Sequence, residues 1–191
     1  MRILVIGAGV IGSIYGWQLE KSGCHVTHLV RKSKIDLYQA NGIKINCLDL
    51  RRSGRSQSEE KYQPEFVSDF DEKNPYQYIL VAVNSHQLPE ILPVLQEKSG
   101  NSTIVFLQNL RLGDDELISQ HMHPSKYIIA YPFKAGGGRT ENLVDGVIFG
   151  MPLTNTVIGE VDGTITARVR EFHHLLKKAN MKPKIITDII P

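Results

Sequence analysis

The sequence has few cysteines and no long apolar run, and both shortages narrow the class of protein. Cys24 and Cys47 are the two cysteines among 191 residues, and their spacing suits neither a metal site nor a redox motif. A disulfide-stabilised scaffold is therefore excluded, and we expect two free thiols. The apolar segment before Gly7 has five residues, Arg2 to Ile6. It is too short for a signal peptide or a membrane span, so we expect a cytoplasmic protein with no membrane partner.

Charge of one sign is not in excess either. The chain has 22 basic and 20 acidic residues, which gives a formal net charge of +2. The only basic cluster outside the second predicted strand, Arg51 to Arg55, is interpreted as part of a solvated loop or hairpin. No basic face interleaved with aromatic residues is present, so nucleic acid is not an expected partner. The length suits one α/β domain with a few additional strands.

The most informative motif stands at the N-terminus. Arg2 to Ile6 is typical of a buried parallel strand, and an amphipathic helix is predicted from Val10 to about Lys21. Between them, Gly7, Gly9 and Gly12 have the G-x-G-x-x-G spacing, in which the glycines serve the tight turn, the approach of a diphosphate and close helix packing. The phosphates would lie at the helix N-terminus, where unpaired N–H groups favour anions. The alternative is a glycine-rich turn that binds nothing.

The end of the second predicted strand, His25 to Val30, indicates which dinucleotide is bound. Proteins that bind NAD usually have a carboxylate there, which contacts the ribose hydroxyls. This chain has Arg31, Lys32 and Ser33 instead. A guanidinium can hold the 2′-phosphate of NADP, so we expect NADP (NADPH) as the cofactor and a contact from Arg31. The alternative is a solvated basic turn. The missing carboxylate also argues against FAD and S-adenosylmethionine.

Strands and helices alternate in the first half of the chain, which predicts a parallel sheet covered on both faces. Strands are predicted at residues 2–6, 25–30, 43–48, 66–67, 78–83, 103–107 and 127–130. Helices are predicted at 10–21, 35–40 and 114–120, and a further helix has Leu88, Ile91, Leu92 and Leu95 on one face. Residues 51–63 are polar and aperiodic, so we expect a mobile loop. Residues 133–138, 143–149 and 156–158 are predicted to be extended, with a helix at 165–179 and a strand at 184–187. The fold class is therefore α/β, a doubly wound, mostly parallel Rossmann sheet with an antiparallel extension in the second half.

Ligands of such a sheet collect at the carboxyl ends of its strands, and three of these ends are polar. They are Asn84-Ser85-His86-Gln87, Gln108-Asn109, and Tyr131 with Lys134. We interpret His86 as a loop residue rather than a catalytic group. Lys134 with Gly136–Gly138 is interpreted as a hairpin turn rather than an anion-binding flap. His121 and His123 have no third ligand nearby, so no metal site is predicted.

At these strand ends the sequence resembles the ketopantoate reductase family, and the match extends over nearly the whole chain. The matching segments are IGAGVIGSIYG (6–16), LVR (29–31), VAVNSHQ (81–87), LQN (107–109) and VIG (157–159). The resemblance implies reduction of a 2-keto acid to a 2-hydroxy acid by NADPH. By this resemblance, the residues that would hold the cofactor are Gly7, Gly9, Val10, Ile11, Gly12, Arg31, Asn84, Gln87 and Asn109. Asn109 is also the catalytic candidate, near the nicotinamide ribose and the substrate.

Two positions depart from that family. Asn84 stands where the motif V-x-V-K-[AS]-x-Q has lysine, and Leu110 replaces the glycine of L-Q-N-G. Losing the cation weakens carboxylate recognition, and Leu110 crowds a turn that prefers glycine. The family's proton-donating lysine belongs to a helical domain that would begin after Pro191. We therefore expect residues 1–191 to form an NADP-binding Rossmann domain without the helical substrate domain, with Ile189 and Ile190 left exposed.

Two functions stay open at this point. One is the cofactor-binding part of an NADPH-dependent reductase, whose partner is a small keto acid and which binds NADPH without turning over substrate alone. The other is an NADP-binding sensor or partner module that has lost reductase chemistry. A homodimer is compatible with either function. Other dehydrogenases of the superfamily, such as opine or glycerol-phosphate types, fit the LVR and LQN segments less well.

Overall fold

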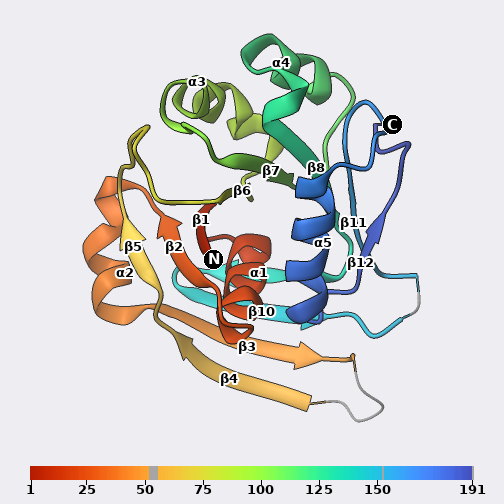
Figure 1. The fold of residues 1–191 in the computed structure, drawn as a ribbon. Helices are drawn as coiled ribbons and strands as arrows, with labels where there is room; N and C mark the ends of the chain where they lie inside the picture. Colours follow the sequence, from red (N-terminus) through yellow and green to blue (C-terminus); the bar gives the residue numbers. More distant parts are fainter. Residues whose placement is uncertain (52–55, 152, 191) are drawn as a thin grey trace.

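The computed structural model describes residues 1–51, 56–151 and 153–190, and shows an α/β fold with two sheets (Figure 1). The strands are β1 Arg2–Ile6, β2 His25–Leu29, β3 Ile43–Asp49, β4 Ser56–Tyr62, β5 Glu65–Val67, β6 Tyr78–Val81, β7 Thr103–Leu107, β8 Tyr127–Pro132, β9 Ala135–Thr140, β10 Leu143–Ile148, β11 Thr156–Gly159 and β12 Pro183–Ile185. The α-helices are α1 Val10–Lys21, α2 Ile35–Asn41, α3 Leu88–Lys98, α4 Asp114–His121 and α5 Ala167–Lys178. The predicted elements of the first half are therefore confirmed, apart from residues 51–63.

The large sheet has the predicted doubly wound topology. Its eight strands follow the order β12-β11-β8-β7-β6-β1-β2-β5. β1 pairs in parallel with β2 on one side and with β6 on the other, and β7 and β8 continue in parallel beyond β6. The strand order therefore reverses at β1, because β2 lies on one side of it and β6 on the other. This reversal places a ligand crevice at the carboxyl ends of β1 and β6. β11 pairs antiparallel with β8, which confirms an antiparallel extension of this sheet.

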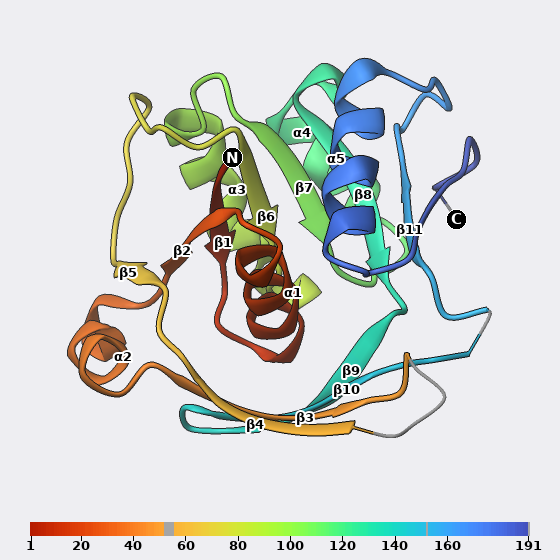
Figure 2. The same cartoon turned by 60° about the horizontal axis from the view of Figure 1, so that its bottom comes forward.

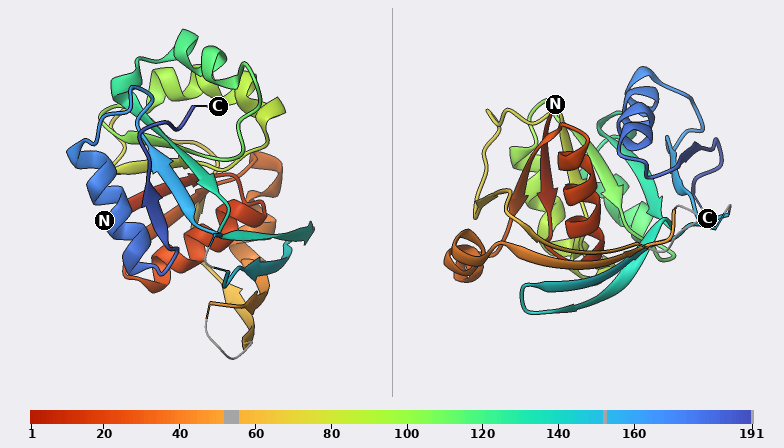
Figure 3. Two further views of the ribbon diagram at one scale, coloured as in Figure 1. Left: turned by 90° about the vertical axis from the view of Figure 1, so that its right-hand side faces the viewer. Right: turned by 90° about the horizontal axis from the view of Figure 1, so that it is seen from below.

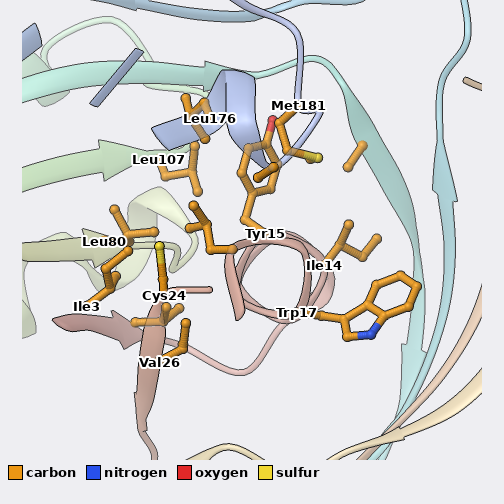
Figure 4. Close-up of a cluster of buried hydrophobic side chains, with 14 of the residues drawn as sticks. Ile3, Ile14, Tyr15, Trp17, Cys24, Val26, Leu80, Leu107, Leu176 and Met181 are labelled. Atoms are coloured by element: carbon orange, nitrogen blue, oxygen red, sulfur yellow. The ribbon is translucent and has the colours of Figure 1, made fainter. Parts of the chain in front are cut away.

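Helices cover both faces of the large sheet, and the alternation of side chains along each strand divides the core between them. In β1, Ile3 and Val5 lie in the core beside α1 and α5, whereas Leu4 and Ile6 lie in the core beside α3 and α4 (Figure 1). Figure 4 shows part of the first core, where Tyr15 of α1 points toward α5 and the segment that follows it. Strands buried on both faces read as continuous apolar runs, which is why the sequence reveals them.

The second sheet lies beside α1 as a separate layer (Figure 2, Figure 3). Its strand order is β4-β3-β10-β9, with β3 parallel to β10 and both outer pairs antiparallel. A Cβ atom on Gly146 of β10 would lie 2.6 Å from Ile14 Cδ1, so glycine permits the close approach of this strand to α1. The extended segments predicted at 133–138 and 143–149 exist, but they join β3 and β4 and do not extend the large sheet.

The expectation for residues 51–63 is wrong where the structure describes them. Residues 56–62 form β4, which pairs antiparallel with the whole of β3. Most side chains of this edge strand are exposed, so it lacks the alternation by which a half-buried strand is recognised. Arg51 is not solvated, because its side chain is 11% exposed and pairs with Asp49. Residues 52–55, with the rest of the basic cluster, lie outside the described part of the chain.

Two further expectations for the second half are wrong. Gly136–Gly138 lie inside β9, and the chain turns after it at Glu141 and Asn142. Ile189 is 3% exposed and packs in the core beside α3 and α4, where Ile190 also packs partly buried. Ile189 reaches this core because Gly159 of β11 has no side chain there. A Cβ atom on Gly159 would lie 3.0 Å from Ile189 Cβ.

Cys24 and Cys47 are free, as predicted, and both are buried. Among the helices of the described residues, none combines the length and apolar character that crossing a bilayer requires. α1 and α5 are 12 residues long each.

Candidate active site

The glycine-rich turn has the predicted geometry. Gly7 has a φ of +103°, and a Cβ atom there would lie 2.7 Å from the carbonyl oxygen of Ala82 at the end of β6. A Cβ atom on Gly12 would lie 2.3 Å from the carbonyl oxygen of Gly7. Both positions therefore exclude a side chain. The turn packs directly against the end of β6, at the point where the strand order reverses.

Gly9 differs from its two neighbours in the motif, because a Cβ atom there would meet no atom within 4 Å. It is the N-cap residue of α1, with no side-chain cap, and the first turn contains no acidic residue. Val10 and Ile11 of that turn are partly buried. The first N–H groups of a helix have no partner within the helix, and the helix dipole makes this end positive. The open backbone at Gly9 and the uncapped N–H groups fit the diphosphate of a dinucleotide.

The ends of β6 and β7 bring together the other predicted site residues. Asn84 caps the 3-10 helix Ser85–Gln87, and its backbone N–H donates to Oε1 of Gln87 over 3.2 Å. Ser85 Oγ donates to the carbonyl oxygen of Asn109 over 3.3 Å, which ties the two strand ends together. Asn84 and Asn109 are exposed and Gln87 is half-buried. The arrangement is therefore a polar rim beside the glycine-rich turn, with Asn84 and Gln87 engaged in capping.

Arg31 lies at the other side of the turn. It lies two residues after Leu29, the last residue of β2, and is exposed at the N-cap of the 3-10 helix Lys32–Lys34. The backbone N–H of Gly7 donates to the carbonyl oxygen of Leu29 over 3.4 Å, so the end of β2 adjoins the glycine-rich turn. Arg31 is thus an exposed guanidinium near the glycine-rich turn. No finding tests its predicted contact with a 2′-phosphate, which stays a prediction.

A buried histidine lies behind the turn, at a position that no sequence pattern indicates. His28 is fully buried, and its Nε2 lies 3.2 Å from Oη of Tyr62 on β4. Burial is the main cause that lowers the pKa of His28 to about 3. A backbone hydrogen bond with Gly7 opposes this lowering, and the positive charge of Arg139 contributes to it. His28 is therefore neutral at physiological pH and joins the two sheets. A polar residue inside a strand buried on both faces carries no pattern that marks its role.

Two polar groups at the ends of β7 and β8 are buried without partners. Gln108 is 6% exposed, and within the described residues neither its amide nitrogen nor its amide oxygen has a hydrogen-bond partner. The hydroxyl of Tyr131 also lacks one there, and its ring stacks on Phe133 with centroids 5.6 Å apart. Lys134 is 2% exposed, and burial lowers its pKa. Lys134 does lie in a turn, but this turn joins β8 of the large sheet to β9 of the small sheet, so the predicted hairpin is wrong.

Arg139 is a further residue of this region that the sequence did not reveal. It lies on β9 and donates through Nη1 to the carbonyl oxygen of Ala8, between Gly7 and Gly9. Its guanidinium also lies 5.6 Å from the ring centroid of Tyr38 on α2. The contact joins positions 131 residues apart, so no local motif could have indicated it.

Comparisons with known proteins identify the family to which this chain belongs. A model of the family described as ketopantoate reductase PanE/ApbA matches residues 3–162. A 2-dehydropantoate 2-reductase of Nostoc sp. is 25% identical over 194 residues, which cover 99% of this chain and 57% of that protein. The chain therefore spans little more than half the length of this curated relative.

Solved structures share the fold. The crystal structure of 2-dehydropantoate 2-reductase from Geobacter metallireducens has a TM-score of 0.77 at 21% identity, covering 98% of this chain and 58% of that one. D-mandelate dehydrogenase in complex with NADH and anilino(oxo)acetate has a TM-score of 0.75 at 18% identity, covering 97% and 56%. The family match takes in the glycine-rich turn, the end of β6 and Asn109. The chain belongs to the ketopantoate reductase PanE/ApbA family.

Proposed function

We propose that this chain is the nicotinamide-dinucleotide-binding part of a 2-keto acid reductase. The observation that carries the proposal is the uncapped N-terminus of α1 with open space at Gly9, placed at the reversal of strand order. The names of the relatives support the reaction class, because two are 2-dehydropantoate 2-reductases and one is a mandelate dehydrogenase with bound NADH. The proposed reaction transfers a hydride to the carbonyl carbon of a 2-keto acid, which gives a 2-hydroxy acid.

The residues of this chain would bind the cofactor and orient the substrate, and NADPH would supply the hydride when bound. The backbone at Gly7, Gly9, Val10, Ile11 and Gly12 would hold the diphosphate. Gln87 and Asn84 would line the cofactor, and Asn109 would orient the substrate beside the nicotinamide ribose. The resemblance places the proton-donating lysine in a helical domain, so residues 1–191 alone are expected to bind without turnover.

We further propose that the cofactor is NADPH in preference to NADH. Arg31 is an exposed guanidinium at the end of β2, a position where NAD-binding proteins usually have a carboxylate. A charge-assisted hydrogen bond contributes about 1.5–3 kcal/mol, which corresponds to roughly ten- to a hundredfold in affinity. Arg31 thus accounts for a clear preference without any other difference in the site.

One observation favours the second function, an NADP-binding sensor or partner module. Asn84 replaces the lysine of the family motif, and its side chain accepts from the backbone N–H of Gln87 as part of a capping box. The side chain is thus used locally, and a neutral amide holds a substrate carboxylate less well than an ammonium group does. On this alternative the chain binds NADPH but gives no response to a keto acid.

A fluorescence titration with NADPH and NADH, side by side, tests the proposal. We expect tighter binding of NADPH, and we expect Arg31→Ala to weaken NADPH about ten- to a hundredfold while leaving NADH unchanged. Arg170→Ala on the exposed face of α5 is the control, because it removes the same charge far from the site. Failure of the wild-type chain to bind either nucleotide would overturn the proposal.

Adding ketopantoate to the NADPH-loaded chain separates the two functions. A change in the fluorescence of bound NADPH, with no consumption of NADPH, supports the reductase part as proposed. No change at saturating ketopantoate, or with other 2-keto acids, favours the sensor or partner module. Consumption of NADPH would instead assign the complete reaction to these residues.

A further inference from the structure

Arg139 places a positive charge against a loop that already favours anions. Its Nη1 donates to the carbonyl oxygen of Ala8, and its Nε donates to the carbonyl oxygen of Glu141 over 2.8 Å. Within the residues that the structure describes, none of its contacts is to a carboxylate. The guanidinium therefore has neutral acceptors only.

The direction of the side chain follows from the strand pairing. Arg139 of β9 lies opposite Val144 of β10, and Val144 is fully buried. Residues directly opposite in an antiparallel pair project from the same face of the sheet. Arg139 therefore projects from the inner face of the small sheet, and its contact with Ala8 directs it toward the turn between β1 and α1.

The charge of Arg139 is met by two carbonyl oxygens and the ring of Tyr38, and by no anionic group among its contacts in the described residues. The N-terminus of α1 is the positive end of its dipole, and its first turn contains no acidic residue. Arg139 as a whole residue is exposed, and loss of solvent around the part of its side chain that faces the turn lowers the pKa of the guanidinium. A cation held at a positive helix end without a carboxylate is stabilised when an anion joins the two.

We propose that Arg139 binds the diphosphate of the cofactor, as a second cation distinct from Arg31. The inference rests on the proposed function and adds a residue from the small sheet to that site. Ala8 lies between Gly7 and Gly9, so the guanidinium already reaches the part of the turn where a diphosphate would approach. On binding, Arg139 exchanges the carbonyl oxygen of Ala8 for a phosphate oxygen. β9 is an edge strand with one neighbour, so it can adjust without breaking a second ladder.

The test compares the two arginines with the two nucleotides. NADPH and NADH share the diphosphate and differ in the 2′-phosphate. Arg139→Gln should therefore weaken both by about ten- to a hundredfold, whereas Arg31→Ala should weaken NADPH alone. Arg139→Lys keeps the charge without the planar fork and should recover part of the loss. Arg170→Gln is the matched control, and thermal unfolding of each variant confirms that it folds.

Inorganic diphosphate tests the Arg139 contact independently of nucleotide binding. It should raise the unfolding temperature of the wild-type chain and of Arg170→Gln, and raise that of Arg139→Gln much less. If the wild type binds diphosphate but neither nucleotide, the proposed function fails while this contact stands. An Arg139→Gln variant that binds diphosphate and both nucleotides like the wild type overturns the inference. Weakening confined to NADPH overturns it as well, since it would assign Arg139 to the 2′-phosphate.

Discussion

The two sheets of this molecule differ in how they are covered and in what they bring to the site. The large sheet is buried on both faces, and its carboxyl ends carry the glycine-rich turn, Asn84 and Asn109. The small sheet packs one face on α1 and leaves much of the other exposed, and it brings Arg139 to the turn. The large sheet therefore fixes the position of the site, whereas the small sheet adds a charge to it. His28 and Tyr62 lie where the two sheets meet.

The largest expected difference in unfolding free energy comes from replacing one glycine in each region with alanine. Gly7→Ala forces a residue with a side chain into a φ of +103° and against the carbonyl oxygen of Ala82, and we expect a loss of about 3 kcal/mol of unfolding free energy. A Cβ atom on Gly138 of β9 would meet nothing within 4 Å, so Gly138→Ala should change stability by less than about 0.5 kcal/mol. Urea unfolding followed by circular dichroism measures both. Equal losses would show that the turn is no more constrained than the edge of the small sheet.

A smaller effect is expected from pH at the junction of the sheets. Burial holds the pKa of His28 at about 3, against 6.5 for a free histidine. Below pH 6.5 the unfolded chain binds a proton that the folded chain does not, so stability falls as the pH drops from 6.5 toward 3. We expect this residue to account for a loss of about 1.4 kcal/mol between pH 7.5 and 5.5.

The control for this prediction is a second histidine. His28→Gln should lower stability at every pH but remove the His28 part of the pH dependence. His174→Gln on the exposed side of α5 should leave that dependence as in the wild type. Urea unfolding at the two pH values measures it. The same slope in His28→Gln and in the wild type would mean that His28 does not carry the effect.

The smallest effect is expected at the outer strand of the small sheet. Glu60 of β4 accepts from Trp17 Nε1 over 3.0 Å and from Lys21 Nζ over 2.8 Å, and its side chain is 41% exposed. Exposed ion pairs contribute little, so Glu60→Gln should cost about 0.5 kcal/mol, and less in about 0.5 M salt. Unfolding of Glu60→Gln, Lys21→Met and the double variant isolates the pair. A coupling above about 1 kcal/mol would show that β4 is held mainly by this pair.

The same difference between the sheets explains how far the sequence predicts the fold. Strands such as β1 and β6 are short apolar runs next to glycine or polar turns, and they are predicted with boundaries close to those observed. β4 reads SQSEEKY, and only Tyr62 of its side chains is buried. Its existence depends on pairing with β3, which is a tertiary effect with no local apolar period. The parallel pairing of β3 with β10 is likewise absent from any local pattern.

The residues of the candidate site also differ in whether the sequence predicts them. Gly7, Gly9 and Gly12 are found from their spacing and context, and Asn84 and Asn109 from their places after buried strands. Each of these signals lies within a few residues of the strand that carries it. Arg139 reaches Ala8 from 131 positions away, through the packing of one sheet on another. Such a contact depends on the assembled layers, so only the structure reveals it.

The parallel pairing of β3 with β10 has a consequence for how the chain is made. Asn46 of β3 donates to Asp145 of β10 across 99 positions of sequence, in a ladder that sets Lys44 opposite Leu143. A ribosome that adds roughly 5–20 residues per second produces β10 about 5–20 s after β3 has emerged. Through that interval the β3–β4 hairpin has an open edge. β1, β2 and β5–β8 of the large sheet emerge before β10, whereas β11, α5 and β12 follow it. An interaction that covers β3 before β10 arrives would therefore protect the open edge from aggregation.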